Sequence, residues 1–330
     1  MAQMQASFAD LADDGQRRRS RRAKFLDSMD AIVPWAEWTA LVEPHYPDGR
    51  RGRRPFGCER MLRMYLLQVW FSLSDEGCED AVLDSRAMQR FVGVDTMSEQ
   101  VPDATTLCKF RHLLERERLG ERMLSELAAI LQDRGVMMRG GSIVDATFVE
   151  APSSTKNASR SRDPEAHQAK KGNNWHFGYK AHAGADAGTG LVHTVEVTAA
   201  NVSDVAVAHR LLRPDDAFCY ADAGYTGVAK RPEVAGDPAL SSVEFKVARR
   251  RSVVPGRNHP EASWEPGIET ALSRVRSRVE HPFHVVKDVF GLRKTRYRGL
   301  AKNRNMLSVA FALANLCLLA WSGRPIPAAA

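Results

Sequence analysis

The spacing of hydrophobic residues changes along the chain and divides it into two parts. Between residues 26 and 135 apolar side chains recur every three or four positions, as at Leu62, Leu66 and Val69, which predicts helices. From residue 141 the pattern shifts to short runs of β-type residues, at 142–149, 175–183, 191–199, 217–222 and 243–249. A cluster of glycines at 135, 140 and 141 marks the expected boundary.

The second part combines β-type runs with helical segments. Residues 202–212 are helical in pattern and separate the third and fourth runs, and the helical pattern returns from Gly267 to Trp321. This order predicts an α/β fold with a mixed sheet and helices packed on it. The polar segment 153–172 reads as a long loop. The most apolar segment, 306–321, is too short to cross a bilayer, so we expect a buried helix and no membrane role.

A pair of predicted helices stands at the end of the first part. Asp103 or Thr105 can cap the first helix, and Gly120 suggests a break before the second. Lys109 and Arg111 are expected to be exposed between apolar positions. The pair is consistent with a helix-turn-helix DNA reader, but the pattern alone favours an ordinary helical bundle that has a charged face.

The net charge is +7 and the pI about 9.3, which favours polyanionic partners such as DNA or RNA. The basic run 17–22 is either a DNA-binding arm or a solvated tail. The five cysteines form no CxxC pair, which argues against a disulfide framework or a zinc ribbon. The polar N-terminus lacks the apolar core of a secretory signal, so a cytoplasmic protein is expected.

Two aspartates directly follow apolar β-type runs. Asp145 comes after Ser142-Ile143-Val144, and Asp222 comes after Phe218-Cys219-Tyr220-Ala221. A single aspartate at such a place is usually a helix cap or a turn residue, but burying one without a partner costs several kcal/mol. Two of them in one sheet raise the prospect of a metal site, and carboxylates are ligands for Mg²⁺.

A third acidic residue, Glu280, lies in the C-terminal helical segment. Arg276 and Lys287 stand four residues before and seven residues after it, offsets that share one helix face. The alternative is a solvated face with a routine ion pair. Pro282 disfavours helix at His281, so the helix is expected to kink or to begin there.

Several stretches together carry a resemblance to a known family. They are VPDATTLCKFR (101–111), VDATFVEAPSSTKN (144–157), KKGNNWHFGYKAHAG (170–184), TVEVTAANVSDV (194–205), YADAGYTG (220–227) and VEHPFHVVKDVFGLRKTRYRGLAKN (279–303). In this order they resemble bacterial insertion-sequence transposases of the DDE type, in the insertion-sequence-five group. The resemblance covers roughly residues 45–320.

The resemblance implies an RNase H-like catalytic domain over residues 139–322. Asp145, Asp222 and Glu280 would then be the catalytic triad and hold two Mg²⁺ or Mn²⁺ ions, with Arg276 and Lys287 on the DNA phosphates. Ser273 stands where the family signature has Tyr. The resemblance further implies a helical DNA-binding domain over 26–138. A basic flexible arm (1–25) is expected before it, and a flexible tail (323–330) is expected after the catalytic domain.

Further DNA contacts are expected at surface lysines and tryptophans. The backbone candidates are Lys156, Lys170, Lys171 and Lys180, with solvated loop charge as the alternative. Trp175 and Trp264 either stack on a base or take part in packing, and His176 and His182 are expected to be structural.

The implied activity is cleavage at insertion-sequence ends followed by strand transfer into target DNA. The expected partners are double-stranded DNA, carrying the terminal inverted repeats or the target, and a second copy of the chain. Two other functions stay open: a DNA-binding regulator without catalysis, and an RNase H-like nuclease without joining activity. Strand-transfer products distinguish the transposase from the nuclease, and binding to element ends without any chemistry would indicate the regulator.

Overall fold

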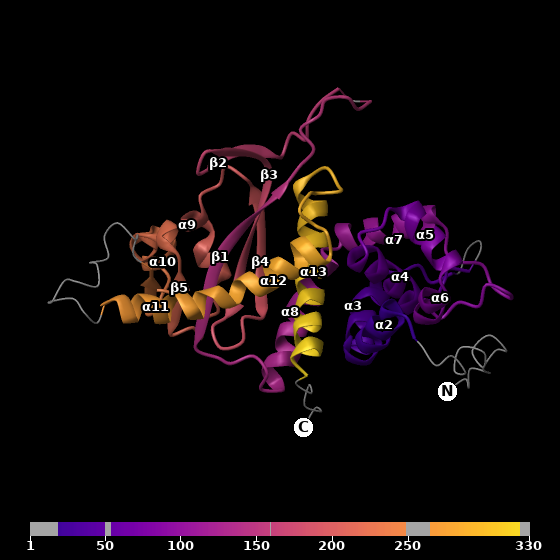
Figure 1. Cartoon of the computed structure of the whole chain (residues 1–330), viewed down its shortest axis with the longest axis horizontal. Coiled ribbons are helices and arrows are strands. Elements are labelled where there is room, and N and C mark those ends of the chain that lie inside the picture. Colours follow the sequence, from indigo (N-terminus) through magenta and orange to yellow (C-terminus); the bar gives the residue numbers. More distant parts are fainter. Residues whose placement is uncertain (1–18, 50–53, 159, 249–264, 324–330) are drawn as a thin grey trace.

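The structure is a computed structural model that describes residues 19–49, 54–158, 160–248 and 265–323. The N-terminal part of the described chain is helical (Figure 1). Its elements are α2 (Arg21–Ile32), α3 (Trp35–Val42), η1 (Glu43–His45), α4 (Cys58–Trp70), α5 (Asp75–Asp84), α6 (Arg86–Val92), α7 (Ala104–Arg116) and α8 (Leu119–Asp133). The helical periodicity therefore predicted the class of this part correctly.

Side-chain caps begin three of these helices. The side chain of Ser20 accepts a hydrogen bond from Ala23 N at the start of α2, and Ser74 does the same for Gly77 N at α5. Asp103, one of the two predicted caps, accepts from Thr106 N at 2.6 Å. Residues 21–25, which we assigned to an arm, are the first turn of α2, and residues 1–18 lie outside the described chain.

The second part contains a six-stranded sheet. Its strands are β1 (Gly141–Glu150), β2 (His167–Lys171), β3 (Asn174–Asp186), β4 (Val192–Ala199), β5 (Phe218–Ala221) and β6 (Glu244–Val247). The order is β2-β3-β1-β5-β6, and β4 also pairs with β3. Strands β1, β3 and β4 are antiparallel neighbours, whereas β5 and β6 run parallel to β1. This mixed sheet with flanking helices is the RNase H-like fold that we expected.

Strand β2 was not predicted. It lies in the segment that we interpreted as a long loop, and it pairs with residues 174–178 of β3. Its side chains are mostly exposed on both faces, so no alternation of apolar and polar residues marks it in the sequence.

Helices and short turns complete the second part. They are α9 (Asp204–Val207), η2 (Ala208–Leu211), η3 (Ala223–Tyr225), η4 (Val228–Lys230), α10 (Pro232–Ala235), α11 (Glu265–Arg276), η6 (Ser277–Val279), α12 (Glu280–His284), the π-helical turn η7 (Val285–Val289) and α13 (Leu300–Ser322). The expectation of one helical stretch from Gly267 to Trp321 is wrong between residues 290 and 299. That segment is not helical, and Lys294 there bridges to Glu150 of β1.

Helix α13 lies between the sheet and the N-terminal helices (Figure 1). By length and composition it is the one described helix that could cross a membrane, but 78% of its most apolar window is buried inside the protein. One hydrophobic core runs from α2 and α4 through α13 to the sheet. The prediction of a buried helix at 306–321 is confirmed.

Gly120 brings α8 close to α13. We expected a break at this glycine, but the chain turns at Glu117–Arg118 and Gly120 lies inside α8. Its amide donates to Asn305 Oδ1 at 2.8 Å, and a Cβ here would lie 2.4 Å from the Asn305 carbonyl oxygen. A glycine is therefore required by the close approach of the two helices.

Candidate active site

Asp145 and Asp222 lie side by side on neighbouring parallel strands. Val144 of β1 is in register with Ala221 of β5, so the two residues that follow are adjacent at the same edge. Each carboxylate accepts one hydrogen bond from local backbone: Asp145 Oδ1 from Ala146 N at 2.7 Å, and Asp222 Oδ1 from Gly224 N at 2.8 Å. The second oxygen of each side chain is left for another partner.

Glu280 reaches this edge from an irregular helical segment. Regular helix ends at Arg276, a 3₁₀ turn covers 277–279, and Glu280 begins the five-residue helix α12 before the π-helical turn η7. The predicted disturbance around Pro282 is therefore present, and it extends on both sides of the proline. Val279 is fully buried and fixes the segment against the sheet, while the Glu280 side chain is exposed.

The electrostatics of Asp145 show that the acidic residues are close neighbours. Burial is the main cause that raises the pKa of Asp145, and the negative charges of Asp222 and Glu280 add to it. The hydrogen bond from Ala146 N and the positive charge of Arg276 oppose the rise, and the net result is a pKa of about 6. No hydrogen bond or ion pair to another described residue neutralises Glu280. The three carboxylates that the sequence singled out are thus brought together with little internal compensation.

The chemistry of this group suits a divalent cation. Carboxylate oxygens are the ligands that Mg²⁺ prefers, and a cation would offset both the burial of Asp145 and its repulsion by Asp222 and Glu280, which together raise its pKa. Within the described ranges, no three His, Cys, Asp or Glu side chains converge tightly enough to hold one metal ion as they stand. The side chains would have to draw together to share a cation, and the exposed Glu280 has the freedom to do so.

Lys287 lies beside this edge and contacts Thr147, a residue that sequence reasoning missed. Lys287 Nζ donates to Thr147 Oγ1 at 2.8 Å. Thr147 stands two positions after Asp145, hence on the same face of β1, and that spacing was the available signal. Burial lowers the pKa of Lys287, and the nearby positive charges of Lys171 and Arg293 lower it further. Cations therefore gather next to the carboxylates.

Lys180 and His182 belong to a structural contact on β3. Lys180 Nζ donates to Val202 O and to Asp204 Oδ1, both at 2.9 Å, which occupies it within the protein. His182 is fully buried, and burial lowers its pKa to about 4. Its Nε2 lies 2.9 Å from Thr198 Oγ1. The structural assignment of His182 therefore agrees with its surroundings, whereas Lys180 has little freedom to reach DNA.

The prediction that Arg111 is exposed is wrong. Its side chain is buried and forms ion pairs with Asp75 at 2.9 Å and with Glu115 at 3.0 Å. Its guanidinium also stacks over the ring of Tyr297, with its carbon 4.3 Å from the ring centroid. Arg111 thus links the N-terminal helices to the C-terminal segment. Asp75 is distant in sequence, so no local pattern announces the pairing.

The other candidates lie at the surface. Lys109 lines a hollow of about 910 Å³ in the helical part, together with Arg54 and Arg116. Lys156, Lys170 and Lys171 are exposed, and Trp175 is 67% exposed. His176 stacks on Phe148, as a structural residue would. Ser273 is exposed on α11, and Trp264 lies outside the described residues.

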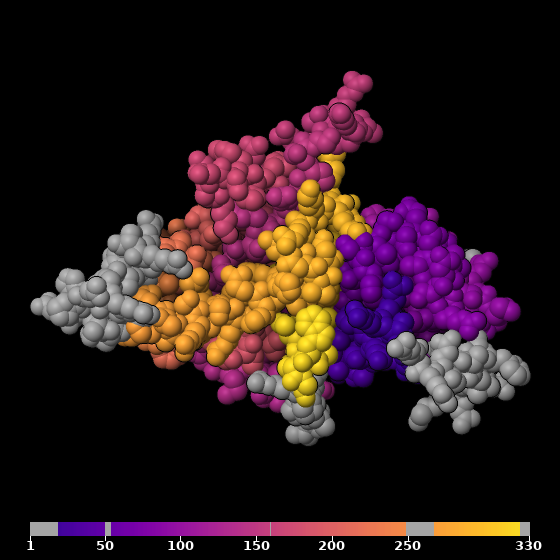
Figure 2. Space-filling view, viewed as in Figure 1, coloured from indigo at the N-terminus to yellow at the C-terminus, as the bar shows by residue number. Residues whose placement is uncertain are grey.

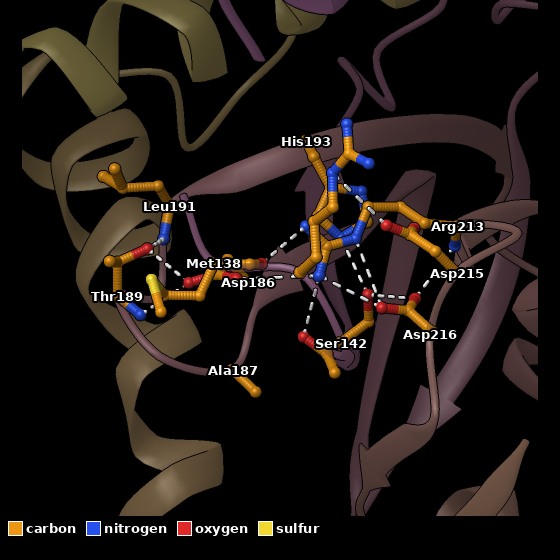
Figure 3. A network of polar contacts seen from close by, with 12 residues as sticks. Met138, Ser142, Asp186, Ala187, Thr189, Leu191, His193, Arg213, Asp215 and Asp216 are labelled. Atoms are coloured by element: carbon orange, nitrogen blue, oxygen red, sulfur yellow. Dashed lines mark hydrogen bonds and ion pairs between the residues drawn. The ribbon is translucent and has the colours of Figure 1, made fainter. Parts of the chain in front are cut away.

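A second polar cluster lies at the start of β1, and sequence reasoning missed it (Figure 3). Ser142 Oγ donates to Asp216 Oδ2 at 2.5 Å and lies 2.9 Å from His193 Nε2. Arg213 donates to Asp216 Oδ1 at 3.0 Å and lies 3.6 Å from Asp186. All five residues are buried, so this cluster is closed to substrate and holds the fold together.

Two family models match the chain. The model described as "Transposase DDE domain" matches residues 137–316, which is more than half of the chain. The model described as "Transposase domain (DUF772)" matches residues 14–113. The first match covers the whole sheet and all three candidate carboxylates.

Proposed function

Because the chain belongs to the DDE transposase family, we propose that it cuts DNA at the ends of an insertion sequence of the insertion-sequence-five group and joins those ends to target DNA. Family membership makes it a DNA-binding, DNA-transposing enzyme. The observation that supports the active-site assignment is the gathering of Asp145, Asp222 and Glu280 at one sheet edge, with the pKa of Asp145 raised to about 6.

We propose that these three carboxylates hold two Mg²⁺ or Mn²⁺ ions. Bound there, the ions would supply charge neutralisation at the attacking and leaving oxygens and a more acidic water. Asp145 and Asp222 directly follow Val144 and Ala221, which pair on adjacent parallel strands. Glu280 closes the group from the helical side. The Gly224 amide donates to Asp222 Oδ1, and a glycine at this position leaves room for that oxygen, because a Cβ would lie 2.9 Å from it.

We propose that the neighbouring cations bind the DNA backbone. Lys287 and Arg276 stand next to the carboxylates and would contact phosphates near the cut. Lys171, Lys156 and Lys109 are exposed and would extend this contact, whereas the buried Arg111 is no longer among the proposed contacts. Joining two ends needs two active sites in one complex, so we propose a homodimer on terminal inverted repeats, acting in the bacterial cytoplasm.

A strand-transfer assay tests this proposal. Purified protein is mixed with labelled DNA that carries the end of the flanking element, a plasmid target and Mg²⁺, and the joined products are counted. Asp222→Asn keeps the oxygen that accepts from Gly224 N but removes the charge, so we expect joining to fall by at least about 100-fold.

Asp237→Asn is the matched control. Asp237 also accepts a hydrogen bond from a backbone amide two residues on, Ala239 N at 2.9 Å, so its replacement makes the same change in a similar turn. We expect wild-type joining from this variant. Cleavage without joining by the wild type would instead indicate a nuclease. End-specific binding without chemistry would indicate a regulator.

A further inference from the structure

The hairpin formed by β2 and the first half of β3 is exposed on both faces. Figure 1 shows it at the upper end of the sheet, above α9 and away from the N-terminal helices. Every side chain of β2 except Ala169 is exposed, as are Asn174 and Trp175 on β3. The hairpin turns at Gly172, whose φ of +60° suits glycine. The hairpin packs against the rest of the protein near its base, where His176 stacks on Phe148 and Phe177 lies against the core, whereas Trp175 is left exposed.

The exposed tryptophan is costly unless a partner covers it. Trp175 is 67% exposed, although a tryptophan normally buries most of its large apolar surface. Lys170 lies directly opposite Trp175 across the two strands. Cross-strand partners share a face, so this hairpin presents an aromatic plane beside a positive charge.

The end of the hairpin carries positively charged side chains and no negatively charged ones. Residues 167–176 contain Lys170 and Lys171 and no acidic residue. Neither lysine forms an ion pair in the described part of the chain. Lys171, on the other face of the hairpin from Lys170, lies near Lys287 and Arg293, so positive charge extends from the hairpin toward the candidate active site. Such a track fits a nucleic-acid backbone.

Trp175 and Lys170 are on the same face of the sheet as Asp145. Asp145 is in register with Ala183, and Trp175 precedes Ala183 by eight positions on the same strand. An even spacing keeps side chains on one face. Eight residues of strand span at most about 26 Å at about 3.3 Å per residue. That length corresponds to about eight base pairs of duplex at about 3.4 Å each.

We propose that the β2–β3 hairpin is a DNA contact in which Trp175 stacks on a base and Lys170 binds the adjacent phosphate, within about eight base pairs of the phosphate that is cut. Aromatic stacking tolerates any base, and the lysine contact is independent of sequence, so the hairpin would position DNA without reading it. This inference rests on the proposed function, because it places the cut at Asp145.

Site-specific cross-linking tests the position. The full-length Asp222→Asn protein, with benzoylphenylalanine in place of Trp175, is irradiated on labelled duplex that carries the element end. We expect an adduct on a base within about eight base pairs of the cut. The matched control carries the same group in place of Trp321, which is 54% exposed at the end of α13, and is expected to give no adduct at these positions.

Affinity measurements test the chemistry. We expect Trp175→Ala to bind the same duplex about tenfold more weakly. Trp175→Phe should stay within about threefold, and Trp321→Ala should match the wild type. Lys170→Ala should lower the slope of log affinity against log salt by about one.

Three results would overturn the inference. DNA binding with no adduct from position 175 would remove the hairpin from the DNA path while leaving the proposed function intact. An adduct between two protein chains would assign Trp175 to a protein interface. Failure of the Asp222→Asn protein to bind any element end would overturn both the inference and the proposed function.

Discussion

Acidic side chains lie beside strand β1 in two very different settings only a few residues apart. At its start, Asp216 and Asp186 are buried and are paired with Arg213, with Ser142 and His193 alongside (Figure 3). Further along, Asp145 stands beside Asp222 and Glu280 and is half-buried. In the first group, Arg213 neutralises the carboxylates. In the second group, the nearby Arg276 only partly offsets the negative charges.

This difference separates a structural cluster from a candidate site. A buried acid without a countercharge lowers the stability of the fold, and the first cluster avoids that cost by enclosing an arginine. The second cluster leaves part of that cost in place, and the pKa of Asp145 is raised as a result. A cation bound by these carboxylates would remove this destabilisation. We infer that the cluster at the start of β1 stabilises the fold, whereas the carboxylates near the middle of β1 lower its stability.

The largest effect is expected from breaking the structural cluster. Arg213→Met removes the cation from between Asp186 and Asp216 and leaves their charges buried, which should lower the free energy of unfolding by about 3–5 kcal/mol. Urea unfolding followed by circular dichroism measures the change.

Arg231→Met is its matched control. Arg231 forms a similar local pair with Glu233 at 3.0 Å, but the two side chains are 35% and 40% exposed. An exposed pair contributes less than about 1 kcal/mol, so this variant should unfold almost like the wild type. Equal losses from both variants would contradict the distinction between an enclosed cluster and a surface pair.

At the candidate site, a mutation is expected to raise the free energy of unfolding rather than lower it. Asp145→Asn removes a charge that the fold disfavours, so it should raise the free energy of unfolding at pH 7 by about 1–3 kcal/mol, since one pKa unit corresponds to about 1.4 kcal/mol. The folded pKa lies above the unfolded one, so the cost of Asp145 grows as pH rises from 3.8 to about 6. The gain should therefore vanish near pH 3.5 in urea unfolding.

Two further measurements sharpen this prediction: the stability of the Asp186→Asn variant and the effect of Mg²⁺ on the melting temperature. Asp186 is buried 3.6 Å from the Arg213 guanidinium, so Asp186→Asn removes a negative charge from beside a buried cation and should lower stability by about 1–3 kcal/mol. Added Mg²⁺ should raise the melting temperature of the wild type and leave that of Asp145→Asn nearly unchanged. A loss of stability in Asp145→Asn would assign Asp145 to the structural class.

Local patterns predicted the features that a strand or helix sets by itself. The β-type runs predicted five of the strands, and the apolar runs before Asp145 and Asp222 placed both residues at one sheet edge. What failed depends on contacts between distant residues. Arg111 pairs with Asp75 of another helix, and the Ser142 cluster joins residues up to 74 positions apart. Strand β2 is defined by its pairing with β3 rather than by apolar residues of its own.

The smallest expected effect is on how the stability of the fold changes as the pH falls. Burial and the nearby Arg213 charge lower the pKa of His193 to about 3, well below its usual 6.5. The stability that neutral His193 contributes is present above pH 6.5 and is lost as pH falls toward 3, whereas protonation of Asp145 adds stability between about pH 6 and 3.8. The two clusters on β1 thus respond to acid with opposite signs.

His193→Gln separates these two responses. Glutamine can still contact Ser142 but takes up no proton, so the fall in unfolding free energy from pH 6.5 to pH 5 should be smaller than in the wild type by about 1–2 kcal/mol. The slope is the readout, because the substitution also shifts the absolute stability at every pH. Unchanged slopes in this variant would mean that His193 is protonated in the folded protein, and the enclosed cluster would then carry a second positive charge beside Arg213.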